Sequence, residues 1–577
     1  MRTTNPFFFL SIFYKARMAV LFSFIALLAA CTATVLPSGD LPVVDLGYEL
    51  HQAISFNKEY DLYNFSNIRY AAPPLDDLRW KLPVAPEKNR AHVQTGDVGR
   101  VCPGALPVWA LLQSQWLTSY WNHTAFELST NISSYPYNPL PADGRTTEDC
   151  LFLDVIVPKA IFDQNNNKGS EYEQLAPVLV WIHGGGQVSE EKAEHDASGL
   201  IQRSMIDEDG IVFVEINYRL GVFGFLAGNI EEDGIANFGL HDQRFALEWV
   251  ADNIHLFGGD PNQVTVMGES AGAGSIVHHI TAYGGDKGPA PFQQAVVQST
   301  GWVPHITEAQ QKATREQFLA LLDVETIDEA RKLPSEKLIA ANTFQVYYTP
   351  FWGSFAYGEV VDGSYVPDTP AKLLLEGRFD HDVKLMIARV EDEGLLFTGP
   401  DSNDTHILEK AVRDFVQVSD ETAKHITDVL YPPIYDGSYG YTDPVQRWAL
   451  FVGDWSLNCN GDYLRRAYDN QTYSYQFNIP PALHAEDIPY TFYYNGSTLG
   501  SIFFNRPVAN ITVALAIQDW ITSFTLYGEP KSKLTPDFPE QGSEALLMDV
   551  RLDSFGLIRD RIDGPRCQFW QTIQYLQ

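Results

Sequence analysis

Gly268-Glu269-Ser270-Ala271-Gly272 is a serine-centred turn near the middle of this chain. It follows a short apolar run, Val264 to Met267, and precedes a helix-like stretch that reaches Ile280. A strand, a sharp turn with glycine on both sides of a serine, and a helix are the context of a nucleophile elbow. Small residues are needed because the backbone crowds there, and the helix N-terminus beside Ser270 favours developing negative charge. Because Gly-x-Ser-x-Gly also occurs by chance, the surrounding pattern must carry the prediction.

Apolar runs alternate with helix-like runs on both sides of this turn. Strands are expected at Val178–Ile182, Ile211–Tyr218, Val264–Met267, Ala295–Gln298, Leu385–Ala388 and Tyr473–Phe477, and helices at Asp242–Phe257 and Ala309–Leu322. This alternation predicts an α/β fold with a central, mostly parallel sheet flanked by helices. Residues 320–450 are less regular and are expected to form insertions that shape a binding gorge. Since no linker or internal repeat divides the chain, residues 34–577 are predicted to form one domain.

A second glycine-rich turn lies upstream of the elbow. The buried strand predicted through Val180 and Ile182 ends in three glycines, Gly184 to Gly186. Only glycine lets consecutive backbone N–H groups converge on a small anion without obstruction by side chains. Together with the N–H of Ala271, these groups are expected to form an oxyanion hole, in which one donor typically contributes about 3–4 kcal/mol. A flexible turn is the alternative interpretation, and the position at a strand end disfavours it.

A serine hydroxyl becomes nucleophilic only when a base takes its proton, and histidine is the usual base. In chains with this elbow the order is serine, acid, histidine. We predict His484 as the base because it follows the strand that ends at Phe477, where a loop can reach over the sheet edge. His406 and His425 lie in polar, helix-like runs and fit surface positions better.

The predicted acid is Glu393, which would fix the tautomer of the histidine and stabilise the imidazolium. It ends the run Glu391-Asp392-Glu393 directly after the strand that contains Leu385 to Ala388. Spacing alone leaves all three acids open, and a solvated loop is the plainer interpretation of such a run.

The composition of the 577 residues is that of a well-packed globular protein, with 13% aromatic and 20% charged residues. A net charge of −33 argues against nucleic acid as a partner, because a phosphate backbone would be repelled.

The N-terminus resembles a secretory signal, which we place at residues 1–33. Lys15 and Arg17 precede an apolar run from Ala19 to Ala30, and small residues follow up to Ala33. The run is too short to span a bilayer comfortably, so no stable membrane span is expected after its removal. The alternatives are a signal anchor through Phe7–Phe13, a start at Met18 instead of Met1, and a bacterial lipoprotein site at Cys31.

Two further features favour an extracellular, eukaryotic protein. Seven Asn-x-Ser/Thr sites follow the signal, at Asn64, Asn122, Asn131, Asn403, Asn470, Asn495 and Asn510. Four cysteines remain after the signal, at Cys102, Cys150, Cys459 and Cys567. An even, sparse set suits two disulfides in an oxidising compartment, and the spacing is not that of a zinc site.

Taken with the elbow, several further blocks resemble the type-B carboxylesterase/lipase family of the α/β-hydrolase fold, which includes the cholinesterases, and in particular its secreted fungal members. The resemblance runs from about residue 40 to 577 and rests on Ile68–Pro74, Leu78–Trp80, Glu148–Leu153, Asn217–Arg219, Asp242–Arg244 and Phe257–Pro261. It implies a carboxylic-ester hydrolase acting on a small-molecule or lipid ester, with no cofactor and no metal. The oligomeric state stays open.

The resemblance also assigns individual residues. It implies the catalytic residues Ser270, Glu393 and His484, the oxyanion donors Gly185, Gly186 and Ala271, the disulfides Cys102–Cys150 and Cys459–Cys567, and the structural ion pairs Arg79–Glu148 and Arg219–Asp242. Closing the first disulfide loop would contribute about 4 kcal/mol in the chain-entropy model.

The chain departs from the family pattern at two positions. Where cholinesterases carry a tryptophan ahead of the second loop cysteine, this chain has Leu140, which puts choline recognition in doubt. The residue after the three glycines is often apolar in relatives, and here it is Gln187, which hints at a polar acyl group.

Two alternatives concern function. The apolar segment Leu106–Leu117 within residues 102–150 either packs over the core, which we favour, or forms a movable lid of a triacylglycerol lipase. A non-catalytic adhesion protein on the same fold is the second alternative, and the complete set of serine, acid, histidine and glycines disfavours it.

Overall fold

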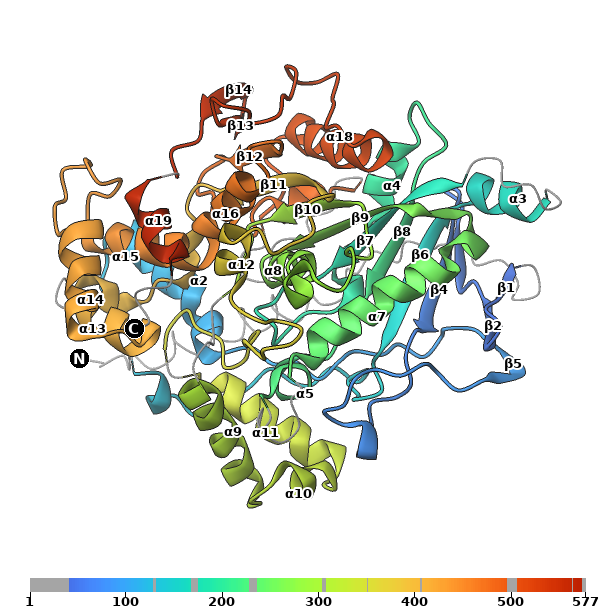
Figure 1. Cartoon of the computed structure of the whole chain (residues 1–577), viewed down its shortest axis with the longest axis horizontal. Coiled ribbons are helices and arrows are strands. Elements are labelled where there is room, and N and C mark those ends of the chain that lie inside the picture. Colours follow the sequence, from blue (N-terminus) through green and yellow to red (C-terminus); the bar gives the residue numbers. More distant parts are fainter. Residues whose placement is uncertain are drawn as a thin grey trace, which may run out of the picture.

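An 11-stranded sheet forms the centre of the protein, in the order β14-β13-β12-β11-β10-β9-β7-β8-β6-β4-β3 (Figure 1). The computed structural model describes residues 41–127, 131–167, 175–227, 236–302, 308–349, 351–404, 407–494, 506–562 and 564–572. The strands of this sheet are β3 (Ser55–Asn57), β4 (Leu62–Arg69), β6 (Phe152–Pro158), β7 (Ala176–Ile182), β8 (Val212–Ile216), β9 (Gly259–Glu269), β10 (Gln294–Gln298), β11 (Lys384–Val390), β12 (Tyr473–Phe477), β13 (Leu546–Arg551) and β14 (Ser554–Arg559). A small separate sheet consists of β1 (Val43–Asp45), β2 (Glu49–Gln52) and β5 (Asn89–Gln94).

Parallel pairing is confined to the middle of the large sheet. Neighbouring strands run parallel from β13 through β12, β11, β10, β9 and β7 to β8. The edges are antiparallel, with β14 on β13 at one side and β6, β4 and β3 at the other. The predicted α/β fold is therefore confirmed, with a mixed sheet whose parallel block holds the six predicted strands.

Side chains of β7 show why this sheet needs helices on both faces. Val178, Val180 and Ile182 lie in the larger of two buried apolar clusters, while Leu179 and Trp181 lie in the other. Successive residues of a strand point to opposite faces, so a continuous apolar run must be covered on both. Helices α7 (Phe238–Asn253) and α8 (Ala271–Ile280) cover one face, and α4 (Ser198–Ser204) and α18 (Ile511–Tyr527) cover the other (Figure 1).

The remaining helices pack around this core. They are α2 (Val108–Trp121), α3 (Lys159–Asn167), α5 (Gly221–Phe225), α9 (Glu308–Leu322), α10 (Ile327–Arg331), α11 (Ser335–Tyr347), α12 (Pro370–Leu375), α13 (Ile407–Ala411), α14 (Asp420–His425), α15 (Pro444–Gly453), α16 (Cys459–Ala467), α17 (Ile488–Thr491) and α19 (Pro565–Gln571). The helix predicted from Asp242 to Phe257 begins earlier, at Phe238, and ends in a short 3-10 turn over Ile254–Phe257. The less regular range 320–450 contains several helices, the strand β11 and irregular segments between them.

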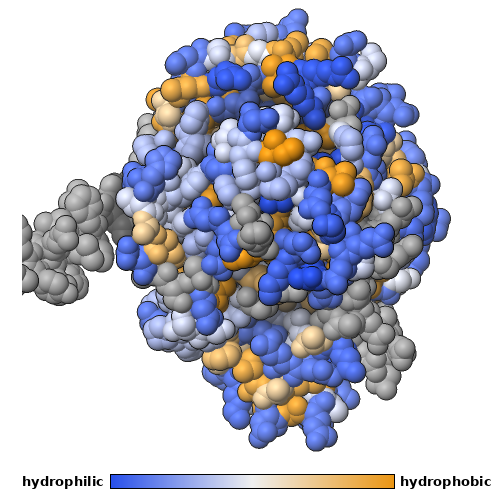
Figure 2. Space-filling model, turned by 90° about the vertical axis from the view of Figure 1, so that its left-hand side faces the viewer, coloured by the Kyte–Doolittle hydropathy of each residue, from blue (hydrophilic) through white to orange (hydrophobic). Residues whose placement is uncertain are grey.

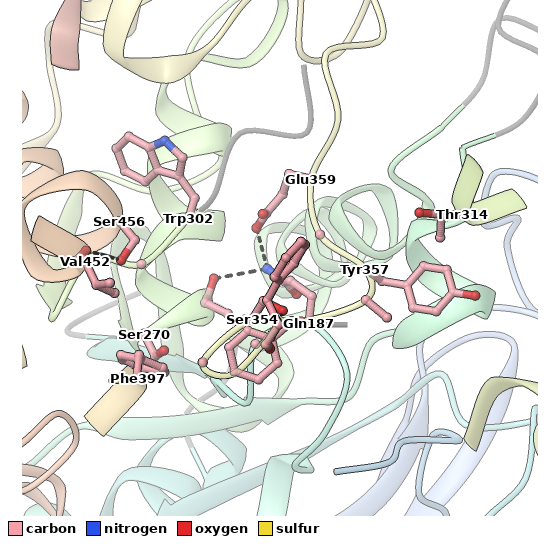
Figure 3. A pocket seen from close by; sticks show the side chains of 18 of the residues that line it. Gln187, Ser270, Trp302, Thr314, Ser354, Tyr357, Glu359, Phe397, Val452 and Ser456 are labelled. Carbon is pink, nitrogen blue, oxygen red and sulfur yellow. Dashed lines mark hydrogen bonds between the residues drawn. The ribbon is translucent and has the colours of Figure 1, made fainter. Parts of the chain in front are cut away.

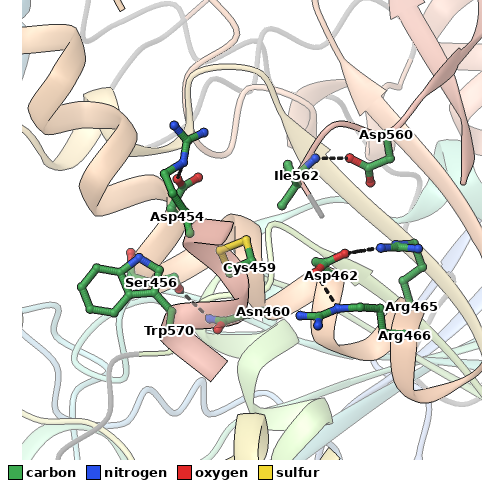
Figure 4. The surroundings of a disulfide bond; sticks show 12 residues. Asp454, Ser456, Cys459, Asn460, Asp462, Arg465, Arg466, Asp560, Ile562 and Trp570 are labelled. Carbon is green, nitrogen blue, oxygen red and sulfur yellow. Dashed lines mark hydrogen bonds and ion pairs between the residues drawn. A yellow bond between two sulfur atoms is a disulfide. The ribbon is translucent and has the colours of Figure 1, made fainter. Parts of the chain in front are cut away.

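Two disulfides and two buried ion pairs tie distant segments together. Cys102 is joined to Cys150 and Cys459 to Cys567, the pairs that the resemblance implies, and the second joins α16 to α19 (Figure 4). The guanidinium of Arg79 donates twice to Glu148, both at 2.8 Å. That of Arg219 donates twice to Asp242, both at 2.7 Å. Because all four charged groups are buried, losing one partner would cost about 3–5 kcal/mol.

Several sequence-based expectations concern the surface or residues outside the described ranges. The predicted signal, His406 and Asn495 lie outside the described residues. Among the other glycosylation candidates, Asn122, Asn131 and Asn403 are exposed, whereas the Oδ1 atom of Asn64 is buried. The face in Figure 2 is mostly hydrophilic, with hydrophobic residues in small scattered groups. In the described part of the chain, no helix has the length and apolarity needed to cross a membrane.

Candidate active site

Ser270 lies in the sharp turn between β9 and α8, with φ 55° and ψ −122°. Its N–H donates to the carbonyl of Gln298 on the neighbouring strand, at 3.0 Å. Glycine flanks the serine for a steric reason. A Cβ at Gly272 would lie 2.2 Å from the carbonyl oxygen of Ile182, and one at Gly268 would lie 2.7 Å from the backbone of Gly272. The turn therefore holds the hydroxyl in one place above the parallel strands.

Two groups from loops after later strands, His484 and Glu393, extend a hydrogen-bonded chain from this hydroxyl. His484 Nε2 lies 2.8 Å from Ser270 Oγ, and His484 Nδ1 lies 2.6 Å from Glu393 Oε2. The histidine is 3% exposed and the glutamate 1%. Glu393 begins the turn after β11, where its Oε1 accepts from the N–H of Val390 at 3.0 Å. His484 lies in the loop after β12. The three predicted groups thus form one continuous hydrogen-bonded chain.

The two loops that carry the acid and the base are joined directly. The N–H of Asp392 donates to the carbonyl of Ala482 at 2.9 Å, so Glu393 and His484 are positioned against each other by backbone pairing. Neither of the other acids of this run is recorded in contact with the imidazole. Glu391 accepts from Gln476, and burial together with the charge of Glu391 raises the pKa of Asp392 to about 6. The geometry thus identifies Glu393 as the acid that contacts His484, a choice that sequence spacing left open.

The glycine turn after β7 faces the same serine. Gly185 and Gly186 adopt φ values of 85° and 62°, a region that favours glycine. Among the described residues, the N–H groups of Gly185, Gly186 and Ala271 donate to no protein acceptor. A Cβ on Gly186 would lie 2.5 Å from the ring of Phe355. These donors are thus available to an oxyanion formed beside Ser270 Oγ.

We expect Gly186→Ala to lower kcat/KM for a p-nitrophenyl ester by about 100-fold or more, because the methyl group displaces the donor. The measurement is steady-state kinetics with the melting temperature taken in parallel. Gly363→Ala is the matched control, since Gly363 also has a positive φ, 70°, but nothing lies within 4 Å of its added Cβ. A Gly186→Ala enzyme with parental activity would show that the N–H of Gly186 is not an oxyanion donor.

Glu269 is a site residue that the sequence analysis quoted without giving it a role. Its Oε1 lies 3.2 Å from His484 Nε2, and the side chain is buried. Burial raises its pKa well above the ordinary range, and the nearby acids Glu190, Asp487 and Glu393 raise it further. Its position directly before Ser270 in the sequence could have indicated that Glu269 lies in the site. It gives the imidazole a second carboxyl neighbour.

Ser270 and Gly186 border two cavities of unequal size. The larger, of about 330 Å³, is walled by aromatic residues that include Trp302, Phe355 and Phe397, and it contains Gln187 and Glu359 (Figure 3). The smaller, of about 40 Å³, is bordered by His484 and by three glutamates, Glu190, Glu194 and Glu269. The serine is therefore approached from two sides, and the imidazole borders only the smaller cavity.

The smaller cavity carries less negative charge than its composition indicates. Burial, together with the charge of Glu194, raises the pKa of Glu190 to about 8, so this carboxyl is largely neutral at pH 7. Burial also lowers the pKa of His195 to about 4, which keeps that ring neutral. Leu140 is 60% exposed and borders neither cavity. A stacked aromatic ring for a quaternary ammonium is thus not supplied from this position.

Helix α2, which contains most of the apolar segment 106–117, borders the smaller cavity through Ala110 and is fixed to its surroundings by hydrogen bonds. The indole N–H of Trp109 donates to the carbonyl of Ser354 at 2.8 Å. The amide of Gln113 donates to the carbonyls of Leu395 and Thr398, at 3.4 and 3.2 Å, and accepts from the indole of Trp352. Ordinary packing, which the sequence analysis favoured over a lid, agrees with these contacts.

Comparison with known proteins places this geometry among the esterases. Residues 51–570 match the profile of the carboxylesterase family. The carboxylesterase patB of Aspergillus clavatus is 37% identical, over 96% of this chain and 100% of that protein. Lipase 1 of Geotrichum candidum is 32% identical, over 60% of this chain and 62% of the lipase. The crystal structure of Aspergillus niger EstA superposes with a TM-score of 0.75 at 24% identity, over 93% of this chain and 99% of that one, and so supports the fold.

Proposed function

Since this chain belongs to the carboxylesterase family and is therefore a carboxylic-ester hydrolase, we propose that it is a secreted enzyme that cleaves esters through an acyl intermediate on Ser270. The hydrogen-bonded chain from Ser270 Oγ through His484 to Glu393, of 2.8 and 2.6 Å, carries this proposal. A base bonded to the hydroxyl and a carboxylate bonded to the base make a neutral alcohol nucleophilic.

In the first half of the reaction His484 Nε2 takes the proton of Ser270 as Oγ attacks the ester carbonyl. The oxyanion is stabilised by the N–H groups of Gly185, Gly186 and Ala271, and Glu393 stabilises the imidazolium. His484 then protonates the leaving alcohol, and the ester C–O bond breaks. In the second half water, deprotonated by His484, attacks the acyl group, and the proton returns to Ser270.

The two cavities then take different parts of the ester. Because the leaving alcohol must receive its proton from His484, it lies in the smaller cavity, which His484 borders. The acyl group points into the larger cavity, which Ala271 borders. With volumes of about 40 and 330 Å³, the site favours a small alcohol and a larger acyl group.

Two observations support secretion. The disulfides Cys102–Cys150 and Cys459–Cys567 suit an oxidising compartment, and Asn122, Asn131 and Asn403 are accessible to glycosylation. Expression in a eukaryotic host should place the protein in the medium, with an N-terminus near residue 34 and glycan removed by an endoglycosidase. Retention in the cytosol would contradict the localisation without affecting the chemistry.

Partitioning to an added alcohol tests the intermediate. With methanol present, an acyl-enzyme divides between water and methanol after the leaving group has departed. Ethyl, phenyl and p-nitrophenyl esters of one acid should therefore give the same ratio of methyl ester to free acid. A ratio that changes with the leaving group would contradict a common intermediate on Ser270.

We expect no jump in rate when a triacylglycerol is raised through its solubility limit, because the contacts of Trp109 and Gln113 fix α2 in place. The measurement is the initial rate on tributyrin in a pH-stat, with an interfacially activated lipase as the positive control. A severalfold rise at the limit would instead support the lid and the lipase alternative.

A further inference from the structure

The larger cavity contains an acidic group that hydrolysis itself does not use. Glu359 is 5% exposed and borders the cavity, and one of its oxygens accepts a hydrogen bond from the amide of Gln187 (Figure 3). Within the described residues, no lysine, arginine or histidine nitrogen lies within 4.0 Å of this carboxyl. Burial raises its pKa, and His278 and the hydrogen bonds oppose this effect. A buried acid without a salt-bridge partner can accept a further hydrogen bond from a ligand in the cavity.

Gln187 links this acid to the reacting centre. Its Nε2 lies 3.2 Å from the carbonyl of Ala271, whose N–H is an oxyanion donor, and 3.0 Å from Ser275 Oγ. The side chain is 2% exposed, and its Oε1 is buried without a hydrogen-bond partner. Because this oxygen is covered, the acceptor at the cavity is the carboxyl of Glu359, which Gln187 holds in place. Aromatic rings, among them Trp302 and Phe397, form part of the surrounding wall. A few polar groups in an apolar pocket fix which ligand binds and how.

We propose that Glu359, positioned by Gln187, selects esters whose acyl group carries a hydroxyl. This rests on the proposed function, which places the acyl group in this cavity. A hydroxyl donates to a carboxylate and also pairs with a neutral carboxyl, so it suits Glu359 in either protonation state. An ammonium group pairs well only with the ionised form and pays a large desolvation cost among Trp302, Phe355 and Phe397. An acyl group with its own carboxylate would be repelled.

The selection is measured as a ratio of kcat/KM values. The substrates are ethyl esters of butyric, 3-hydroxybutyric, hexanoic and 6-hydroxyhexanoic acid, which share one small alcohol and place the hydroxyl at two depths. We expect at least one hydroxylated ester to exceed its unsubstituted partner by about 10-fold or more, the usual effect of a hydrogen bond to a buried acid. The Glu359→Leu variant should reduce that ratio to about 1, with Glu359→Gln between the two.

Ser456→Ala is the matched control. Ser456 borders the same cavity, where its hydroxyl is occupied by the carbonyl of Val452 at 2.7 Å, so its loss should leave the hydroxyl ratio as in the parent enzyme (Figure 3). Turnover of ethyl butyrate and labelling of Ser270 by a fluorophosphonate establish that each variant is folded.

Three results would contradict the proposed selection of a hydroxylated acyl group or the function on which it rests. Hydroxyl ratios near 1 in the parent enzyme, or a high ratio that survives in Glu359→Leu, would overturn the proposal while ester hydrolysis stands. Preference for ethyl 3-aminobutyrate over the 3-hydroxy ester would overturn it in favour of a cationic acyl group. Absence of both turnover and labelling would instead remove the proposed function on which it rests.

Discussion

Replacing Ser270 by alanine is expected to lower kcat for p-nitrophenyl butyrate by about 10⁵-fold, because the substitution removes the atom that bonds to the acyl group. The residual rate should come from the oxyanion donors and binding alone, so KM should change far less than kcat. Since Ser270 Oγ contacts His484 and the turn is held by backbone hydrogen bonds, the fold should persist. Active-site titration and steady-state kinetics on the purified variant are the measurements.

Ser402→Ala is the matched control for this variant. Ser402 is buried and its hydroxyl donates to the carbonyl of Gly399 at 2.6 Å, at a position that borders neither cavity. It should retain kcat within about twofold. A Ser270→Ala enzyme that keeps more than a few per cent of the parent activity, free of host esterase, would mean that another group attacks the ester.

Replacing Glu393 by glutamine is expected to lower kcat by about 10⁴-fold without unfolding the protein. The carboxylate holds the proton of His484 on Nδ1 and stabilises the imidazolium. The amide of glutamine can instead donate to Nδ1, and the imidazole proton then lies on Nε2. A protonated Nε2 cannot accept the proton of the Ser270 hydroxyl. Glu393→Asp should recover part of the activity, because the charge returns at a longer distance.

Asp392→Asn provides a sharp comparison, because Asp392 is the adjacent acid and only its backbone pairs with the loop of His484. We expect it to lower kcat by less than 10-fold. If Asp392→Asn were the more damaging of the two substitutions, the acid of the relay would have been misassigned. This pair of variants decides in solution between two of the three consecutive acids that spacing left open.

Local patterns predicted the parallel core well. β12 has the predicted bounds, and β7, β10 and β11 extend the predicted ranges by only a few residues. These strands are buried on both faces, so their apolar runs stand out from the flanking polar loops. The antiparallel edges were not predicted. β14 has mostly exposed or half-buried residues, and β4 contains a register shift, so neither gives a clear periodic signal.

The site was only partly predictable for a related reason. The elbow and the glycine turn are short motifs whose backbone geometry is local, as the close approach of Gly272 to Ile182 requires. The partners of Ser270 and of His484 lie 214 and 91 residues away in sequence, and chain order with strand position was needed to find them. Glu359 lies 172 residues from Gln187 and follows no recognisable pattern. Only folding brings this acid into the larger cavity.

Covalent labelling tests most directly whether Ser270 is the nucleophile. The purified protein is treated with a fluorophosphonate until activity is lost, and it is then digested and its peptides are sequenced by mass spectrometry. We expect one phosphonate per molecule, on the peptide that contains Ser270, and no label after Ser270→Ala or prior denaturation. Loss of activity with Ser270 unmodified, or an active enzyme whose Ser270 is fully labelled, would show that the reaction does not pass through this serine.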